Sequence, residues 1–197
     1  MGYTTEFSGR FLLNKELDKE LYDYLVKFNE TRRMARDPGR LKSLKLKLYY
    51  GIEGEYFVEG KGFMGQDPDE SILDSNRPPK TQPSLWCQWR PTKDHKGIEW
   101  DGGEKFHHYR EWMKYILKNF LVPKGYDISG KVHYQGEDPD DHGDLDGAKL
   151  TAEVLSEINT QAKPTAEVSE MNQTIPLVPP APSDGLTVLK PRKIRLN

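Results

Sequence analysis

The sequence predicts an α+β domain in which an antiparallel sheet of four to six strands packs against two helices, with a disordered C-terminal arm. Three observations support this prediction: short stretches of alternating apolar residues, two longer stretches with helical periodicity, and a change of composition after Gly136. We expect residues 1–147 to form a single domain. Residues 148–197 should add a weakly helical segment and a disordered, proline-rich basic tail.

Several short stretches have the two-residue period of a half-buried strand. Residues 3–13 alternate in this way and should open the sheet. Residues 44–50 alternate again, and a glycine-containing turn separates them from residues 55–58, which predicts a hairpin. Residues 126–135 offer a further strand, with a bend or bulge at Gly130.

The first helix should begin at Asp18, which is a plausible N-cap. Leu21, Leu25 and Phe28 follow at helical spacing, and we expect the helix to end near residues 34–36.

The second helix has the strongest pattern, because apolar residues recur on one face at three- and four-residue spacing: Phe106, Tyr109, Met113, Ile116, Leu117, Phe120 and Leu121. Asp101 and Glu104 have the spacing of a capping box at its start. Pro123 should end it. We expect its aromatic side chains to pack in the core, with Trp100 buried at the helix entry.

An aromatic strand, Leu85-Trp86-Cys87-Gln88-Trp89-Arg90, precedes this helix. Cys87 is the chain's single cysteine, so it cannot form an intramolecular disulfide, and its place in the alternation predicts a small buried thiol.

No catalytic residue, metal site or cofactor is predicted. The chain has no nucleophile-elbow, zinc-protease, Walker or dinucleotide-binding motif, which favours a protein without enzymatic activity. The acidic run at 137–141 leads into His142 and Gly143 with partial EF-hand spacing, but Lys149 stands where the bidentate glutamate is required. The chain also has no run of about 18 apolar residues, so we expect no membrane span and a cytoplasmic location.

A basic stretch at 29–47 holds seven cations against two anions, in a chain whose net charge is −2. Arg32 and Arg33 in this stretch, with Arg77, Trp86 and Trp89, could hold phosphate and stack a base. The plainer interpretation is a basic outer face of a helix and a hairpin.

The end of the chain combines cations with aliphatic residues. Lys190, Arg192, Lys193 and Arg195 alternate with side chains whose exposure to water is unfavourable, namely Val188, Leu189, Ile194 and Leu196. This combination favours docking onto a protein partner, or onto the acidic run at 137–146 of the same chain. A dispensable tail is the alternative.

Six segments of the chain combine aromatic, proline and charged residues in distinctive sequences: MGYTTEF at 1–7, TRRM at 31–34, NRPP at 76–79, QPSLWCQW at 82–89, IEWDGGEKF at 98–106 and QGED at 135–138. Together these segments resemble a group of short uncharacterised proteins of bacteria and their phages. The resemblance implies one small domain, a phage-related origin and, if phage-encoded, a location in the host cytoplasm. A short closing strand would be expected after Gly143, where this chain has Asp144-Leu145-Asp146-Gly147 and a long tail.

We therefore expect a non-enzymatic phage or prophage accessory protein that binds a host or phage macromolecule. The alternative is a nucleotide- or nucleic-acid-binding protein, or an enzyme, that uses Arg32 and Arg33 together with Arg77, Trp86 and Trp89. The oligomeric state is not predicted.

Overall fold

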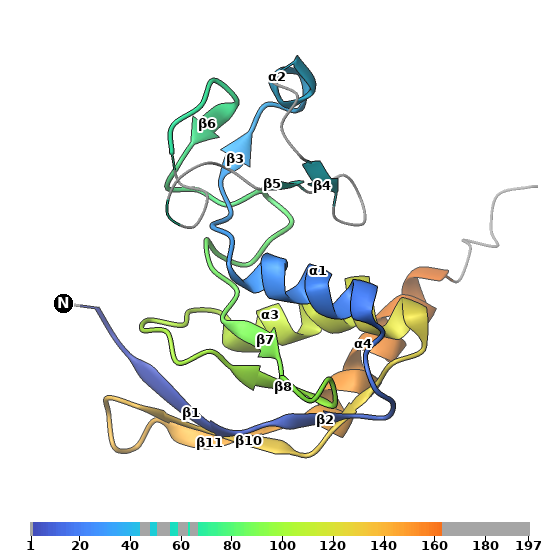
Figure 1. The fold of residues 1–197 in the computed structure, drawn as a ribbon. Helices are drawn as coiled ribbons and strands as arrows, with labels where there is room; N and C mark the ends of the chain where they lie inside the picture. Colours follow the sequence, from blue (N-terminus) through green and yellow to red (C-terminus); the bar gives the residue numbers. More distant parts are fainter. Residues whose placement is uncertain (1, 44–47, 51–55, 59–62, 64–66, 163–197) are drawn as a thin grey trace, which may run out of the picture. The chain divides into compact units, whose positions relative to one another are not determined.

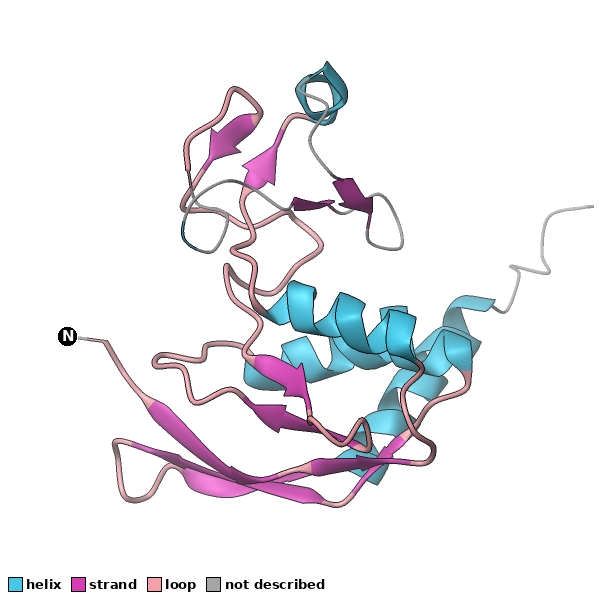
Figure 2. Ribbon diagram, in the orientation of Figure 1, coloured by secondary structure: helices cyan, strands magenta, loops and turns pink. Residues whose placement is uncertain are grey.

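The computed structural model describes residues 2–43, 48–50, 56–58, 63 and 67–162. Within them, antiparallel strands combine with helices, so the predicted α+β class is confirmed (Figures 1 and 2). Residues 44–47 of the predicted hairpin and the predicted tail from 163 onward, including Lys190, Arg192, Lys193 and Arg195, lie outside the described residues.

Two antiparallel sheets lie beneath the main helices (Figure 1). The first has the order β1-β10-β11, formed by Thr5–Gly9, Lys131–Gly136 and His142–Asp146. The second has the order β7-β8-β2-β9, formed by Trp89–Pro91, Gly97–Trp100, Phe11–Leu13 and Ile128–Ser129. Two short pairs complete the described strands: β3 (Ala35–Arg36) with β6 (Ile72–Asp74), and β4 (Leu48–Tyr50) with β5 (Tyr56–Val58). The last pair confirms the predicted hairpin.

The stretch 3–13, predicted as one strand, is divided between the two sheets. Gly9 has a φ of +92°, which a residue with a side chain rarely adopts, and the chain changes sheet there from β1 to β2. The predicted bend at Gly130 is confirmed by a φ of +79° and divides β9 from β10. β1 pairs with β10 in one sheet, and β2 pairs with β9 in the other. The bends at the two glycines therefore allow the segments 5–13 and 128–136 to pair with each other in both sheets.

Helix α1 spans Lys19–Asn29, and the predicted cap is confirmed, because Asp18 Oδ1 accepts a hydrogen bond from the Leu21 amide at 2.8 Å. Its predicted end near 34–36 is wrong. The Thr31 hydroxyl bonds the Lys27 carbonyl at 2.8 Å, and the Arg33 amide leaves the helical pattern to bond Leu85 O at 2.8 Å. A short helix, α2 (Pro38–Ser43), follows β3.

Helix α3 spans Tyr109–Ile116 and continues as a π-helix, η3 (Leu117–Leu121), and a 3-10 turn, η4 (Val122–Lys124). The predicted buried face is confirmed, with Met113, Ile116 and Leu121 in the core. The predicted start is wrong, because Lys105 and His108 have positive φ values of 57° and 58° and cannot continue a right-handed helix.

Asp101 and Glu104 therefore form no capping box. Asp101 Oδ1 accepts from the Gly103 amide at 2.7 Å in a local turn, and the Glu104 carbonyl accepts from Gln88 Nε2 at 2.8 Å.

Helix α4 spans Gly147–Ala162 and belongs to the compact unit, which extends to Lys163. The compact unit thus extends beyond residue 147, where the sequence analysis placed the end of the domain. Leu150 and Val154 are completely buried, and β11 supplies the closing strand directly before the helix. Three side-chain pairs, each 43 residues apart in the sequence, join α4 to α3 and η3. They are Arg110 with Glu153 (2.7 Å), Lys114 with Glu157 (3.1 Å) and Lys118 with Gln161 (3.4 Å).

The core is rich in aromatic rings. Phe7 is partly buried and packs against the core, with its ring centroid 4.9 Å from that of Tyr109 and 5.4 Å from that of Trp89. Cys87 is completely buried, as predicted, and burial raises the pKa of its thiol to about 12, so it stays protonated at neutral pH. Trp100 is only half-buried, in contrast to the prediction, and its Nε1 donates to Oε1 of the buried Gln88 at 3.0 Å.

Candidate functional site

The most distinctive surface feature is the stack of Arg32 on Trp86. The Arg32 guanidinium lies 5.7 Å from the centroid of the half-buried Trp86 ring. Its Nε and Nη2 both donate to the Ser75 carbonyl at 3.1 Å, and Nη2 also reaches Asn76 Oδ1 at 3.2 Å. The hydrogen bonds to Ser75 and Asn76, together with the Trp86 ring, thus hold the guanidinium group in one orientation. This is expected when several donors of the planar guanidinium are used together.

Two exposed side chains come from the segment that Arg32 holds. The Leu73 residue is 68% exposed, and the Arg77 side chain is 82% exposed, with its Nε 3.4 Å from Asp74 Oδ2. The backbone beneath is fixed, because the Arg77 carbonyl accepts from the Ala35 amide at 2.9 Å. We name this group the Arg32–Trp86 surface; its members are Arg32, Leu73, Asn76, Arg77 and Trp86.

Two of the predicted binding residues do not reach this surface. Arg33 is 1% exposed; its Nη2 donates to the Phe28 carbonyl, and its guanidinium lies 3.7 Å from the Phe28 ring centroid. Trp89 is also 1% exposed, and its Nε1 donates to Tyr109 O at 2.8 Å. Of the five residues suggested for base stacking and phosphate binding, only Arg32, Arg77 and Trp86 remain near the surface, so the five side chains do not share one exposed face.

The basic stretch at 29–47 is not one open phosphate-binding face either. The Arg36 side chain is only 4% exposed and bonds Asp69 Oδ2 at 2.5 Å and Ser71 Oγ at 2.8 Å. The side chains of Lys42, Lys45 and Lys47 lie outside the described residues.

A polar network that sequence reasoning missed joins α1 to the aromatic segment. Asn29 Nδ2 donates to the Cys87 carbonyl at 2.9 Å and to Asp101 Oδ2 at 2.7 Å. The Asp101 amide in turn donates to the Gln88 carbonyl at 3.0 Å. The sequence segments 82–89 and 98–106 are therefore joined in space by these hydrogen bonds. The only sequence signal was their shared content of polar and aromatic residues.

The acidic run also has a structural role, because it holds the N-terminal segment. Asp141 Oδ2 accepts from the Tyr3 hydroxyl at 2.6 Å, and Glu137 Oε1 accepts from the Thr4 amide at 2.8 Å. The Asp141 carboxylate raises the pKa of the Tyr3 phenol, since it stabilises the protonated hydroxyl. Within the described ranges, no group of three or more His, Cys, Asp or Glu side chains is arranged to hold a metal ion.

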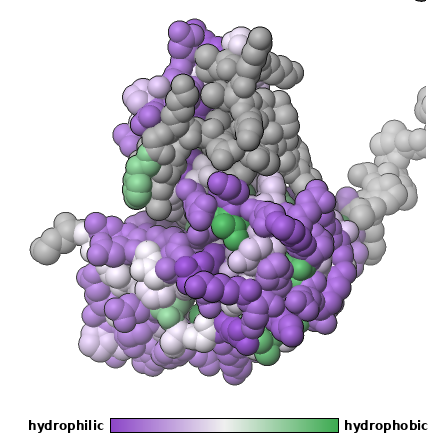
Figure 3. All heavy atoms as spheres, in the orientation of Figure 1, coloured by the Kyte–Doolittle hydropathy of each residue, from purple (hydrophilic) through white to green (hydrophobic). Residues whose placement is uncertain are grey.

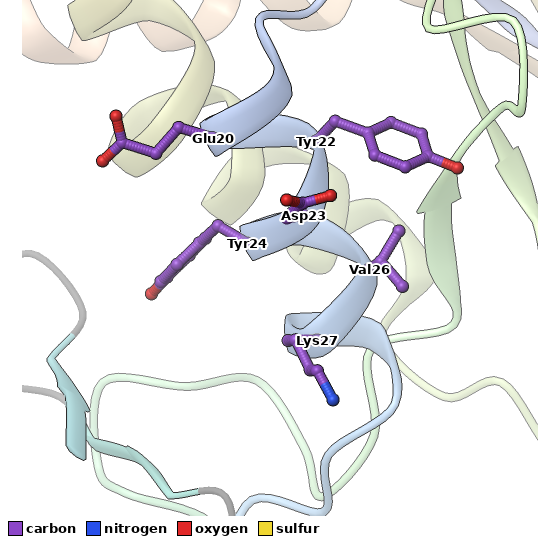
Figure 4. A pocket seen from close by; sticks show the side chains of 6 residues that line it. All are labelled: Glu20, Tyr22, Asp23, Tyr24, Val26 and Lys27. Carbon is purple, nitrogen blue, oxygen red and sulfur yellow. The ribbon is translucent and has the colours of Figure 1, made fainter. Parts of the chain in front are cut away.

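A hollow of about 550 Å³ lies along α1. Figure 4 shows its lining side chains spreading from one helix: Glu20, Tyr22, Asp23, Tyr24, Val26 and Lys27. A smaller hollow of about 250 Å³ lies between α1 and η3, over Leu21 and Phe120. A third, of about 330 Å³, lies between α3 and the loop at 81–83. None of these three hollows includes Arg77 or Trp86, so none is the nucleotide pocket considered above.

The described part of the face drawn in Figure 3 is mainly hydrophilic, with small separate hydrophobic spots. Among the residues that the structure describes, no helix has the length and apolar character needed to cross a bilayer. Comparison of the chain with protein-family models, curated proteins and solved structures gave no match.

Proposed function

We propose that the protein is a non-enzymatic accessory protein of phage or prophage origin that acts by binding a host or phage macromolecule. The phage origin rests on the resemblance of the six sequence segments. The binding role rests mainly on one observation, the fixed stack of Arg32 on the half-buried Trp86.

The chemistry of this surface suits a protein partner. Trp and Arg are the residue types most enriched among those that dominate binding energy at protein interfaces. Arg32 is already held by three hydrogen bonds, so binding would require little further ordering of its side chain. Leu73 offers exposed apolar area, and Arg77 offers a charge that solvent still reaches.

A nucleotide-binding or enzymatic role has less support. Arg33 and Trp89, which that alternative requires, are buried in the described fold. The predicted basic tail at 190–195 remains a second proposed contact with the partner, through Lys190, Arg192, Lys193 and Arg195.

The surface can be tested by affinity purification with mass spectrometry from infected or lysogenic cells, followed by binding measurements with the purified partner. We expect Trp86→Ala and Arg77→Ala each to weaken partner binding at least tenfold. Arg90→Ala is the matched control, because Arg90 is also exposed and paired, at 3.0 Å from Glu99. Equal binding by the wild type and both surface variants would exclude this surface.

The tail requires a separate truncation. Removing residues 184–197 should leave the Tm of the domain unchanged but abolish partner capture, if the tail supplies a necessary contact. Recovery of the same partner with the same yield from full-length and truncated protein would show the tail hypothesis to be wrong. A thermal-shift screen of nucleotides provides the opposing test: a shift that Arg77→Ala removes would favour the nucleotide alternative over a protein partner.

A further inference from the structure

Two histidines lie close together on the outer face of the β10–β11 ladder. Along these strands, Val132 and Leu145 point into the core, whereas His133, His142 and Asp144 are exposed. His133 pairs directly with Asp144, and His142 pairs with Gln135, so the two histidines are diagonal neighbours on the same face. Their ring centroids are 6.4 Å apart.

The hydrogen bonds of the two rings determine which nitrogen carries the proton. His142 Nδ1 lies 2.9 Å from the Pro139 carbonyl, and His133 Nδ1 lies 3.0 Å from Asp144 Oδ1. A carbonyl and a carboxylate can only accept, so in the neutral rings both Nδ1 atoms must be protonated. Each Nε2 then carries a lone pair. A histidine whose Nδ1–H is held by a carboxylate or a backbone carbonyl is in the arrangement that metal-binding histidines usually have.

We propose that His133 and His142 bind one divalent transition-metal ion, such as Zn²⁺ or Ni²⁺, through their Nε2 atoms. In a tetrahedral site or in adjacent positions of an octahedral site, metal–nitrogen bonds of about 2.0–2.1 Å would place the two ring centroids roughly 4.5 to 5 Å apart. The observed separation is 6.4 Å, so the two exposed rings would approach each other by about 1.5 Å on binding. Asp144 is a positioning residue, since it orients the His133 ring rather than binding the ion. Water would fill the remaining positions, because the described residues place no third ligand beside the pair.

The surroundings define the kind of ion. Imidazole ligands suit Zn²⁺, Ni²⁺ and Cu²⁺, whereas Ca²⁺ and Mg²⁺ require oxygen ligands. The acidic turn with Asp138 and Asp140 follows β10 and favours a cation near this face. Lys131 opposes it, because its Nζ lies 3.9 Å from Asp144 Oδ2 and would be repelled by a bound ion.

The site can be tested by calorimetric titration of the untagged full-length protein with NiCl₂ or ZnCl₂. We expect one ion per chain with micromolar affinity, a loss of at least tenfold in affinity for His133→Ala or His142→Ala, and a loss of about tenfold for Asp144→Asn. His107→Ala is the matched control, because His107 is also exposed but lies on the loop before α3. Binding that survives the His133→Ala, His142→Ala double variant would overturn the proposal, and so would equally tight binding of Ca²⁺.

Nitrogen NMR of the imidazole rings supplies a second readout that does not depend on affinity. Without metal, both rings should show a protonated Nδ1, and adding Zn²⁺ should shift Nε2 of His133 and His142 only. Shifts of all five histidines to a similar extent would indicate nonspecific binding and contradict the site. If an alanine variant does not fold, His133→Gln and His142→Gln provide the same test with polar side chains.

Discussion

Two regions of the chain carry cationic side chains a few residues apart: the segment after α1, and the helical segment formed by α3 and η3. The surroundings of these side chains differ between the two regions. After α1, Arg33 and Arg36 turn inward and are almost completely buried. On α3 and η3, Arg110, Lys114 and Lys118 stay at the surface and meet polar partners on α4. The arginines after α1 make contacts inside the fold, whereas the cations of α3 and η3 connect these helices to α4 at the solvent-exposed surface.

This difference shows that charge density along the sequence does not locate a binding surface. A guanidinium can be buried when a carbonyl, a carboxylate or an aromatic face receives its donors. Lysine ammonium groups keep more of their hydration and tend to remain at the surface. Buried and exposed cations also differ in how salt affects them, because exposed pairs are screened much more strongly.

Replacement of Arg33 should have the largest effect. Arg33→Met removes the hydrogen bond from Arg33 Nη2 to the Phe28 carbonyl and the contact of the guanidinium with the Phe28 ring. We expect the free energy of unfolding to fall by about 3 kcal/mol, measured by urea denaturation followed by circular dichroism. A change below about 1 kcal/mol would contradict a stabilising role for the contacts of Arg33 with Phe28.

Replacement of Asp69, whose carboxylate accepts a hydrogen bond from Arg36, should have the second-largest effect on stability. Burial by itself would raise the pKa of Asp69, but hydrogen bonds from Ser71 and Arg36 outweigh it and lower the pKa below the ordinary 3.8. A lowered folded-state pKa means that this stabilisation is fully present above about pH 4 and is lost as the pH falls further. Asp69→Asn should cost about 2 kcal/mol at neutral pH.

In Asp69→Asn, the free energy of unfolding should also depend less on pH below about pH 4 than it does in the wild type. Urea denaturation at a series of pH values measures this dependence. Asp67→Asn is the control, because Asp67 lies in the same loop and is exposed. An identical acid dependence in the wild type and Asp69→Asn would contradict the assignment.

The contacts between α3 and α4 should be weaker and sensitive to salt. Hydrogen bonds from Lys114 and Arg110 lower the pKa of Glu153, which receives both cations at 2.9 and 2.7 Å. Because the side chain is partly exposed, we expect Glu153→Gln to cost only about 0.5–1 kcal/mol at low ionic strength. The difference from the wild type should shrink at about 1 M NaCl, where screening acts over about 3 Å. A loss that stays constant with salt would indicate a packing defect instead.

Arg32→Ala should have the smallest effect on stability. Its hydrogen bonds to Ser75 and Asn76 are exposed to water, so their loss is largely offset by solvation. We expect a decrease of about 0.5 kcal/mol in urea denaturation. A decrease as large as that of Arg33→Met would make Arg32 a structural residue and weaken the case for the Arg32–Trp86 surface.

Local patterns predicted many of the elements. The buried faces of α1 and α3 were readable because apolar residues at three- and four-residue spacing necessarily share one side of a helix. The Asp18 cap was readable because its partner, the Leu21 amide, is three residues away. The end of α1 was not, since the chain leaves the helix to bond Leu85, far along the sequence.

The candidate site was only partly predictable. Arg32, Arg77 and Trp86 were identified from residue type, but Arg33 and Trp89 were included for the same reason and proved to be buried. Neighbouring residues in a loop can point in opposite directions, and composition does not record direction. The histidine pair on β10 and β11 was not predicted at all, because it depends on the register of two strands.

The amino-acid sequence by itself determined the α+β class, the buried Cys87, the β4–β5 hairpin and the bend at Gly130. Each of these depends on interactions within a few residues, or on the fit of one residue type to one backbone conformation. Only the tertiary structure decided that Gly9 divides the first strand between two sheets, that α4 completes the compact unit, and that Tyr3 meets Asp141. These features join segments that are distant along the chain, and their partners become neighbours only when burial of the shared core brings the segments together.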